Sequence, residues 1–226
     1  MTGMEPLLVV NFKAYEQGTG RRGLQLAREI EQASREAGVA VAVAVQAPDI
    51  YHVSQEVSLP VFSQHVDPVE FGSHTGSILA EDVKENGARG TLLNHAEHRI
   101  GLEEIGRAVE ICRSLGLATV VCASSLEEAR AIAACRPEYI AFEDPALIGS
   151  GIPISKAESA EVREFSRLMG PHGIIPLCGA GISSGEDVKA AVELGMRGVL
   201  LSSAVVKADR PGEKARELAE ALNGRA

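Results

Sequence analysis

Residues 7–13 read Leu-Leu-Val-Val-Asn-Phe-Lys, an apolar run that ends in an amide and a cation. Short apolar runs rich in β-branched residues, without polar alternation, are typical of parallel strands that are covered on both faces. An open, doubly wound sheet would carry a glycine fingerprint directly after such a first strand. The turn here reads Asn11-Phe12-Lys13 instead. The stretch therefore favours a closed β/α barrel, with the open sheet as the alternative.

The same kind of run recurs along the 226 residues, and amphipathic segments separate the runs. We expect strands at Leu7–Asn11, Val39–Val45, Val61–Gln64, Gly90–Leu93, Thr119–Cys122, Tyr139–Phe142, Ile174–Cys178 and Val199–Leu201. Helical spacing predicts helices at Gly23–Ala37, Glu103–Leu115, Ser125–Ala134, Asp187–Leu194 and Pro211–Leu222. Glycines that suit helix C-caps stand at the joins, at Gly38, Gly87, Gly116, Gly173 and Gly195. Eight strands close a barrel, so we predict an α/β fold with one (β/α)8 domain over residues 1–226.

The composition excludes several functional classes. A net charge of −9 argues against nucleic acid or an anionic membrane as the main partner, because both require a basic face. The chain shows neither a signal-peptide pattern nor an apolar run of membrane-spanning length, so we expect a cytoplasmic protein. The four cysteines are far apart and contain no CxxC pair, which indicates buried, reduced thiols, with a disulfide as the alternative.

Reactive side chains stand where the predicted strands end. Active sites of β/α barrels lie at the carboxyl ends of the strands, so these residues are expected to meet at one rim. The candidates are Asn11 and Lys13 after the first strand, His95 and Glu97 after the fourth, and Glu143 after the sixth. Small-residue turns follow the last two strands, at Gly179-Ala180-Gly181 and Ser202-Ser203, where backbone N–H groups could hold a phosphate.

Glu143 is the candidate general base. A carboxylate at the end of an apolar strand is partly desolvated, which suits proton abstraction. The next segment, residues 145–151, has an apolar centre between a proline and glycines, a composition typical of a lid. The alternative is a surface glutamate at the start of a loop.

His95 has three possible roles. It can be a neutral imidazole that donates a hydrogen bond to a substrate oxygen, or an exposed histidine in a capped turn. The third possibility is a metal site formed by His95, Glu97 and His98. This site is disfavoured because adjacent side chains point in different directions and no further cluster completes the ligands.

The combination of these segments resembles the triosephosphate isomerase family over nearly the whole chain. The opening Asn11-Phe12-Lys13 matches the family's Asn-x-Lys, and His95 to Arg99 is similar to its His-Ser-Glu-x-Arg segment. Glu143 to Gly151 resembles its base and lid, and Gly72 to Gly76 resembles its third-loop turn, which in the family reaches a neighbouring subunit. The short length resembles the archaeal branch. The family's serine is Ala96 here, the proline after its base is Asp144, and the lid tryptophan of other branches is absent.

The resemblance implies a TIM barrel that interconverts dihydroxyacetone phosphate and D-glyceraldehyde 3-phosphate, without a metal or cofactor. Glu143 would move the proton, His95 would polarise the carbonyl, Lys13 and Asn11 would stabilise the oxyanion, and Glu97 would hold Lys13. Substrate and phosphate contacts would come from Asn11, Phe12, Lys13, Ile148, Gly149, Gly181, Ser202 and Ser203. The resemblance also implies a homo-oligomer, with a tetramer favoured over a dimer.

Two other functions remain open at this point. Another sugar-phosphate barrel, such as an epimerase or an isomerase of amino-acid biosynthesis, would share the phosphate turns but lack the combination of Lys13, His95 and Glu143. A barrel that binds a phosphate ligand without catalysis would retain the turns alone.

Overall fold

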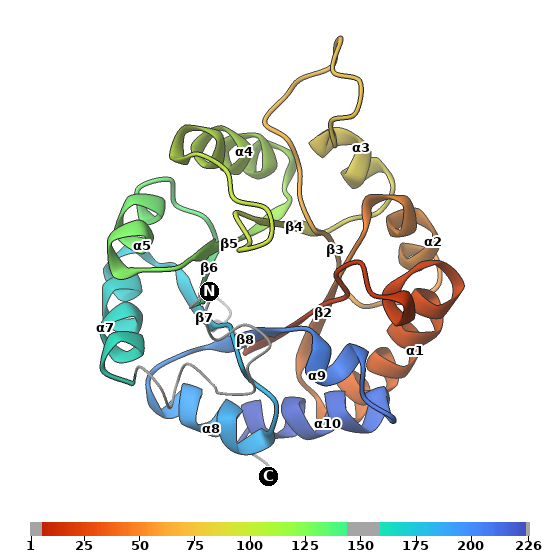
Figure 1. The fold of residues 1–226 in the computed structure, drawn as a ribbon, viewed down its shortest axis with the longest axis vertical. Helices are drawn as coiled ribbons and strands as arrows, with labels where there is room; N and C mark the ends of the chain where they lie inside the picture. Colours follow the sequence, from red (N-terminus) through yellow and green to blue (C-terminus); the bar gives the residue numbers. More distant parts are fainter. Residues whose placement is uncertain (1–5, 144–158, 225–226) are drawn as a thin grey trace.

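The computed structural model describes residues 6–143 and 159–224. Within these residues, parallel strands pair in sequence order and close into an eight-stranded barrel (Figure 1). The strands are β1 (Leu7–Asn11), β2 (Ala40–Val45), β3 (Val61–Ser63), β4 (Gly90–Leu93), β5 (Ala118–Ala123), β6 (Tyr139–Phe142), β7 (Ile175–Cys178) and β8 (Gly198–Leu201). The predicted (β/α)8 barrel is confirmed, and the open sheet is wrong.

Helices surround the barrel on the outside (Figure 1). They are α1 (Gly20–Ala37), α2 (Ile50–Ser54), α3 (Ala80–Glu85), α4 (Leu102–Leu115), α5 (Leu126–Ala133), α7 (Ser159–Met169), α8 (Gly185–Glu193), α9 (Ser203–Val206) and α10 (Pro211–Leu222). The bounds of α10 are those predicted, and the other four expected helices are present with ends shifted by one to three residues. The expected series omitted α7 and the short helices α2, α3 and α9.

The core has two layers, as alternation along the strands requires. Leu7, Val9 and Leu200 belong to a cluster inside the barrel. Leu8 and Val10 belong to a second cluster, which packs between the barrel and the helices. On a strand, the side chain two positions after the last interior residue therefore lies at the carboxyl rim of the barrel.

The glycines at the helix-to-strand joins adopt the backbone conformation that the sequence predicts. Gly38 and Gly116 end α1 and α4 in the left-handed region, with φ of 65° and 71°. The other joins, Gly87, Gly173 and Gly195, also have positive φ, at 98°, 67° and 96°. A side chain would strain the backbone at such positions, so glycine stabilises these helix ends.

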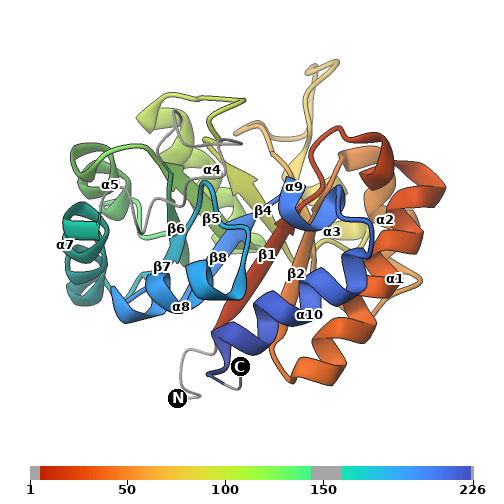
Figure 2. The same cartoon turned by 60° about the horizontal axis from the view of Figure 1, so that its bottom comes forward.

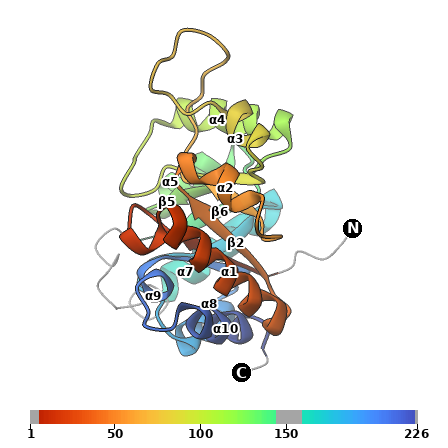
Figure 3. The same cartoon turned by 90° about the vertical axis from the view of Figure 1, so that its right-hand side faces the viewer.

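The outer helices pack against one another as well as on the strands. Figure 2 shows α10 lying beside α1 along one side of the barrel. The chain between β3 and α3 extends away from the barrel, as Figure 3 shows at the top of the view. None of the helices within residues 6–143 and 159–224 combines the length and apolar character of a membrane span. None of the four cysteines forms a disulfide, and Cys112, Cys122 and Cys178 are buried, as expected.

Candidate active site

A pocket of about 230 Å³ opens at the carboxyl ends of the strands. It brings together most of the residues that the sequence singled out. The predicted residues that line it are Asn11, Lys13, His95, Glu143, Gly181, Ser202 and Ser203. Side chains more than 100 positions apart in the chain therefore face one small volume, and the cavity suits a ligand of only a few carbon atoms.

Strand alternation places two of these groups. Asn11 follows the interior residues Leu7 and Val9 on β1, and Glu143 comes two positions after the interior residue Ala141 on β6. Both polar side chains thus continue an inward-facing row at the point where the apolar interior ends. They are buried, with 5% of each residue exposed. The barrel itself positions these two groups.

Backbone strain is concentrated at the same rim. Lys13, Asn94 and Ala180 have positive φ values of 49°, 56° and 64° and are three of the four non-glycine residues with positive φ in the described part of the chain. Each lies one or two positions after a strand whose following turn lines the pocket. Uncommon backbone conformations of this kind occur at sites where geometry matters more than local energy.

Lys13 is held from two directions. Its backbone N–H donates to Asn11 Oδ1 over 2.9 Å, and its Nζ donates to Glu97 Oε1 over 2.7 Å. The Lys13 side chain is only 10% exposed, whereas that of Glu97 is 59% exposed. Glu97 therefore reaches the cation from outside, and the ammonium group remains on the pocket wall.

His95 is arranged to donate a hydrogen bond. The backbone N–H of Glu97 donates to His95 Nδ1 over 3.1 Å, so Nδ1 serves as an acceptor. An imidazole whose Nδ1 accepts carries its proton on Nε2 and is neutral. The ring is buried and lines the pocket, so Nε2–H is the group that a ligand can meet.

The carboxylate of Glu143 is buried and tightly packed. Its Oε2 is buried and has no hydrogen-bond partner among the described residues. A Cβ placed on Gly179 would lie 2.4 Å from Glu143 Cγ and 2.7 Å from Oε1, so glycine is needed there for the carboxylate to fit. Burial raises the pKa of the Cys122 thiol well above its ordinary value, and the nearby Glu143 carboxylate raises it further. Cys122 therefore stays a neutral thiol beside the carboxylate.

The small-residue turns line the part of the pocket wall between Glu143 and Asn11, because β7 and β8 lie between β6 and β1. Gly181 has a φ of 71°, and Ser202 precedes α9, which begins at Ser203. Ser202 Oγ is buried and has no partner within the described residues. Small side chains leave backbone N–H groups accessible there, a feature typical of anion sites in barrels.

Not every predicted contact lines the pocket. Phe12 is fully buried and belongs to the cluster between the barrel and the helices, so its side chain faces away from the cavity. The physical reason is alternation, since Phe12 follows Val10 on the outward face of β1. Ile148 and Gly149, the predicted lid contacts, lie outside the described residues.

The structure adds pocket residues that the sequence did not single out. Tyr15 and Ile182 line the cavity, and the ammonium of Lys207 lies 3.8 Å from the centre of the Tyr15 ring. Tyr15 stands only two positions after Lys13, which is the one signal that could have identified it.

The alternative metal site, formed by His95, Glu97 and His98, does not have the arrangement of ligands that a metal centre needs. The ring of His98 stacks on that of His65, with centroids 4.3 Å apart. No group of three or more His, Cys, Asp or Glu side chains suited to hold a metal occurs among residues 6–143 and 159–224.

Comparison with known proteins agrees with this geometry. The family model for triosephosphate isomerase matches residues 6–221. The triosephosphate isomerase of Methanocaldococcus jannaschii is 47% identical over 94% of this chain and 98% of its own length. Those of Methanobacterium bryantii and Methanothermus fervidus are each 48% identical, over 91% and 90% of this chain and 92% of their own length. The chain belongs to the triosephosphate isomerase family.

Proposed function

We propose that this barrel interconverts dihydroxyacetone phosphate and D-glyceraldehyde 3-phosphate, with Glu143 as the base and His95 as the electrophile. One observation carries the proposal: a buried carboxylate and a neutral imidazole line the same 230 Å³ pocket as the Lys13 ammonium. The reaction needs a base for a carbon-bound proton, a donor to the carbonyl and a stabilised oxyanion, and these three groups supply them.

The proton moves along a short path in this scheme. Glu143 removes a proton from the carbon beside the ketone, the C–H electron pair forms a carbon–carbon double bond, and the carbonyl oxygen becomes an oxyanion. Glu143 then returns the proton to the neighbouring carbon. His95 Nε2–H donates to the charged oxygen, and the hydroxyl proton passes between the two oxygens through the imidazole. No redox partner is required, because one hydrogen moves between carbons and one between oxygens.

The remaining polar groups hold charge. Lys13 places a cation beside the developing oxyanion, Asn11 orients the Lys13 backbone, and Glu97 holds the Lys13 ammonium. The phosphate binds at Gly181, Ser202 and Ser203. The unpartnered Ser202 Oγ supports this placement, because a buried hydroxyl without a partner is costly until a ligand supplies one.

The experiment is a coupled assay with both triose phosphates, applied to the wild type and to Glu143→Gln. We expect kcat to fall by at least about a thousandfold in the variant, while glycerol 3-phosphate binds within about threefold of wild type. A variant that kept near-wild-type turnover would show that the base is another group. If the wild type instead acted on a ketopentose phosphate and left the trioses unchanged, the other sugar-phosphate barrel would be the correct function.

The quaternary structure belongs to the same proposal. The segment between β3 and α3 extends from the barrel and carries Phe71, which is 77% exposed (Figure 3). A second cavity of about 320 Å³ adjoins the active-site pocket and shares Asn11, Lys13 and His95 with it. We place the extended segment of a neighbouring subunit in that cavity. The favoured assembly is a homotetramer, and the alternative is a dimer. Light scattering tests the oligomeric state, because a tetramer or a dimer of the 23.8 kDa chain has four or two times that mass.

The cellular setting completes the proposal. We place the enzyme in the cytoplasm, where it serves glycolysis and gluconeogenesis. Buried cysteines that form no disulfide support a reducing compartment, and the reaction itself is a step between triose phosphates.

A further inference from the structure

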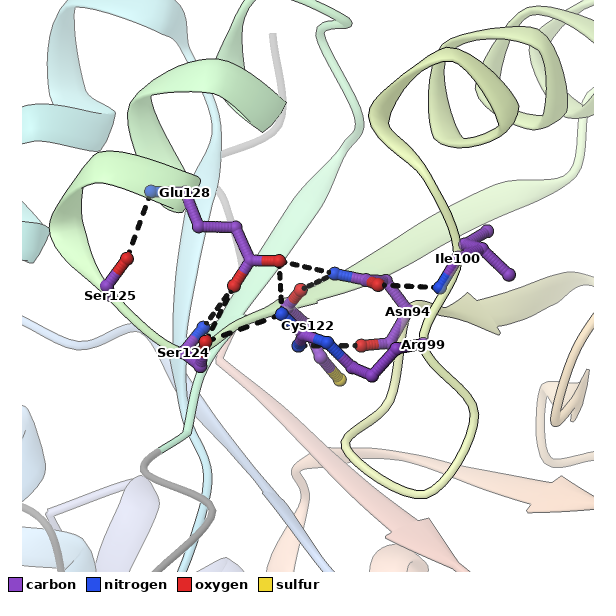
Figure 4. A network of polar contacts seen from close by, with 7 residues as sticks. All are labelled: Asn94, Arg99, Ile100, Cys122, Ser124, Ser125 and Glu128. Atoms are coloured by element: carbon purple, nitrogen blue, oxygen red, sulfur yellow. Dashed lines mark hydrogen bonds and ion pairs between the residues drawn. The ribbon is translucent and has the colours of Figure 1, made fainter.

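Outside the active-site pocket, the described part of the chain holds a polar network around the carboxylate of Glu128 (Figure 4). Glu128 lies in the first turn of α5, where its backbone N–H donates to Ser125 Oγ over 3.1 Å. Neither Glu128 nor its partners Asn94, Arg99 and Ser124 line the pocket. The network nevertheless binds both ends of the turn that carries His95, at Asn94 and at Arg99.

Asn94 is the first link between the network and that turn. It is 1% exposed and has a φ of 56°. Its Nδ2 donates to Glu128 Oε1 and to the Cys122 carbonyl, each over 2.9 Å, and its Oδ1 accepts from the Ile100 N–H over 3.1 Å. Both N–H groups and the carbonyl of the amide are therefore used. The side chain ties residue 94 to residue 100, and so closes the turn that lies between them.

Arg99 is the second link. Its guanidinium donates to Glu128 Oε1, to the Asn94 carbonyl over 3.2 Å and to Ser124 Oγ over 3.4 Å. The backbone N–H and the hydroxyl of Ser124 each donate to Glu128 Oε2 over 2.8 Å. Figure 4 shows the carboxylate between these groups, with Asn94 and Arg99 on one side and Ser124 on the other.

The carboxylate is the only anion among the residues of this network. Burial tends to raise the pKa of Glu128, but hydrogen bonds from Arg99, Ser124 and Asn94 outweigh it and lower the pKa to about 2. An anionic acceptor that takes several charge-assisted hydrogen bonds is rigid. Removal of the charge would leave the buried Asn94 amide without this acceptor, which costs more than the loss of a surface hydrogen bond, and would leave the exposed Arg99 guanidinium without its ion-pair partner.

The held turn contains the groups that the chemistry needs. His95 and Glu97 lie between Asn94 and Arg99, and the hydrogen bond that sets the His95 tautomer is internal to this turn. The same turn carries Glu97, the partner of Lys13. A small rotation of the turn would therefore move the imidazole and release the cation together.

We propose that Glu128 is a positioning residue for this isomerisation: from outside the pocket, it fixes the turn that presents His95 and Glu97. The inference rests on the proposed function. The turn that Glu128 holds follows β4, which lies across the closed barrel from β8, where one of the phosphate turns begins. We therefore expect Glu128 to act on the chemical step and to leave phosphate binding intact.

Glu128→Gln tests the proposal, because the amide keeps the shape but cannot accept all these hydrogen bonds. A misplacement of about 1 Å can cost a hundredfold in rate, so we expect kcat to fall about ten- to one-hundredfold, with KM within about threefold. The matched control is Glu127→Gln, because Glu127 is exposed and lies one position earlier in the same first turn of α5. It removes the same charge near the same helix end, and we expect kcat to remain within about twofold.

A second measurement separates positioning from general loosening. Nitrogen NMR of histidine-labelled protein reports the tautomer of each of the six histidines. In Glu128→Gln, the His95 ring should lose the single Nε2–H form that the structure predicts for wild type, while Glu127→Gln retains it. If Glu128→Gln fails to fold, Arg99→Lys takes its place, because lysine keeps the charge but cannot form the three contacts of the guanidinium.

The outcomes are distinct. A folded Glu128→Gln or Arg99→Lys variant with wild-type kcat and an unchanged His95 signal would overturn the positioning role. An equal loss of activity in Glu127→Gln would also overturn it, because the effect would then be one of helix charge. A wild type without triose isomerase activity would instead refute the proposed function.

Discussion

Gly179→Ala should slow the reaction although it replaces no ionisable group. The added Cβ would lie 2.4 Å from Glu143 Cγ, 2.7 Å from Oε1 and 3.0 Å from Cδ. Carbon atoms pack at about 3.5–4.0 Å, so the carboxylate has to retreat by roughly 1 Å or more. Since a displacement of that size can cost a hundredfold in rate, we expect kcat to fall about a hundredfold. KM should change by less than about threefold, because the proposed phosphate contacts at Gly181, Ser202 and Ser203 are not substituted.

The assay is coupled triose phosphate turnover, with circular dichroism to establish that the variant is folded. Gly170→Ala is the matched control, because a Cβ there meets nothing within 4 Å. A folded Gly179→Ala variant within twofold of wild type would refute the reasoning, since Glu143 would then tolerate displacement or would not be the base.

Three further outcomes follow from the structure. Glu97→Gln removes the charge that holds Lys13, so kcat should fall about tenfold in the coupled assay. Because the Glu97 side chain is 59% exposed, its ion pair with Lys13 contributes less than about 1 kcal/mol to stability, and the urea midpoint should barely move. Burial and the neighbouring His98 lower the pKa of His65, so the folded chain binds this proton less readily than the unfolded chain. The free energy of unfolding should then fall as pH drops below about 6.5, and urea titrations at several pH values should show a shallower fall for His65→Gln. In a thiol-reagent titration at pH 8, only the half-exposed Cys135 should react in the native protein, and the appearance of two or more fast thiols would contradict the burial of the others.

The barrel was predictable because its signal is repeated. Apolar runs and helix-ending glycines recur along the chain, so an error at one strand does not change the count. The ends of β1, β4 and β6 match the prediction, because a polar residue or a glycine marks each one. The short helices α2, α3 and α9 were not predicted, since four to six residues leave too little periodicity to detect.

The site was predictable only in part. Asn11 and Glu143 follow from strand alternation, which is local. The proximity of Cys122 to Glu143 depends on the register between β5 and β6, where Cys122 pairs with Ala141, and a single sequence carries no signal for that register. Glu128 illustrates the same limit. Its place after Ser125 predicts a helix start, which the structure confirms, but its carboxylate serves a turn more than 25 positions away.

Hydrogen exchange with solvent tests the central claim most directly. With dihydroxyacetone phosphate in D₂O, proton transfer through Glu143 predicts that the wild type forms glyceraldehyde 3-phosphate with deuterium at carbon 2, observed by proton NMR. Glu143→Gln should bind the ligand and incorporate almost none. Continued turnover with deuterium incorporation in a folded Glu143→Gln variant would contradict proton transfer by this carboxylate.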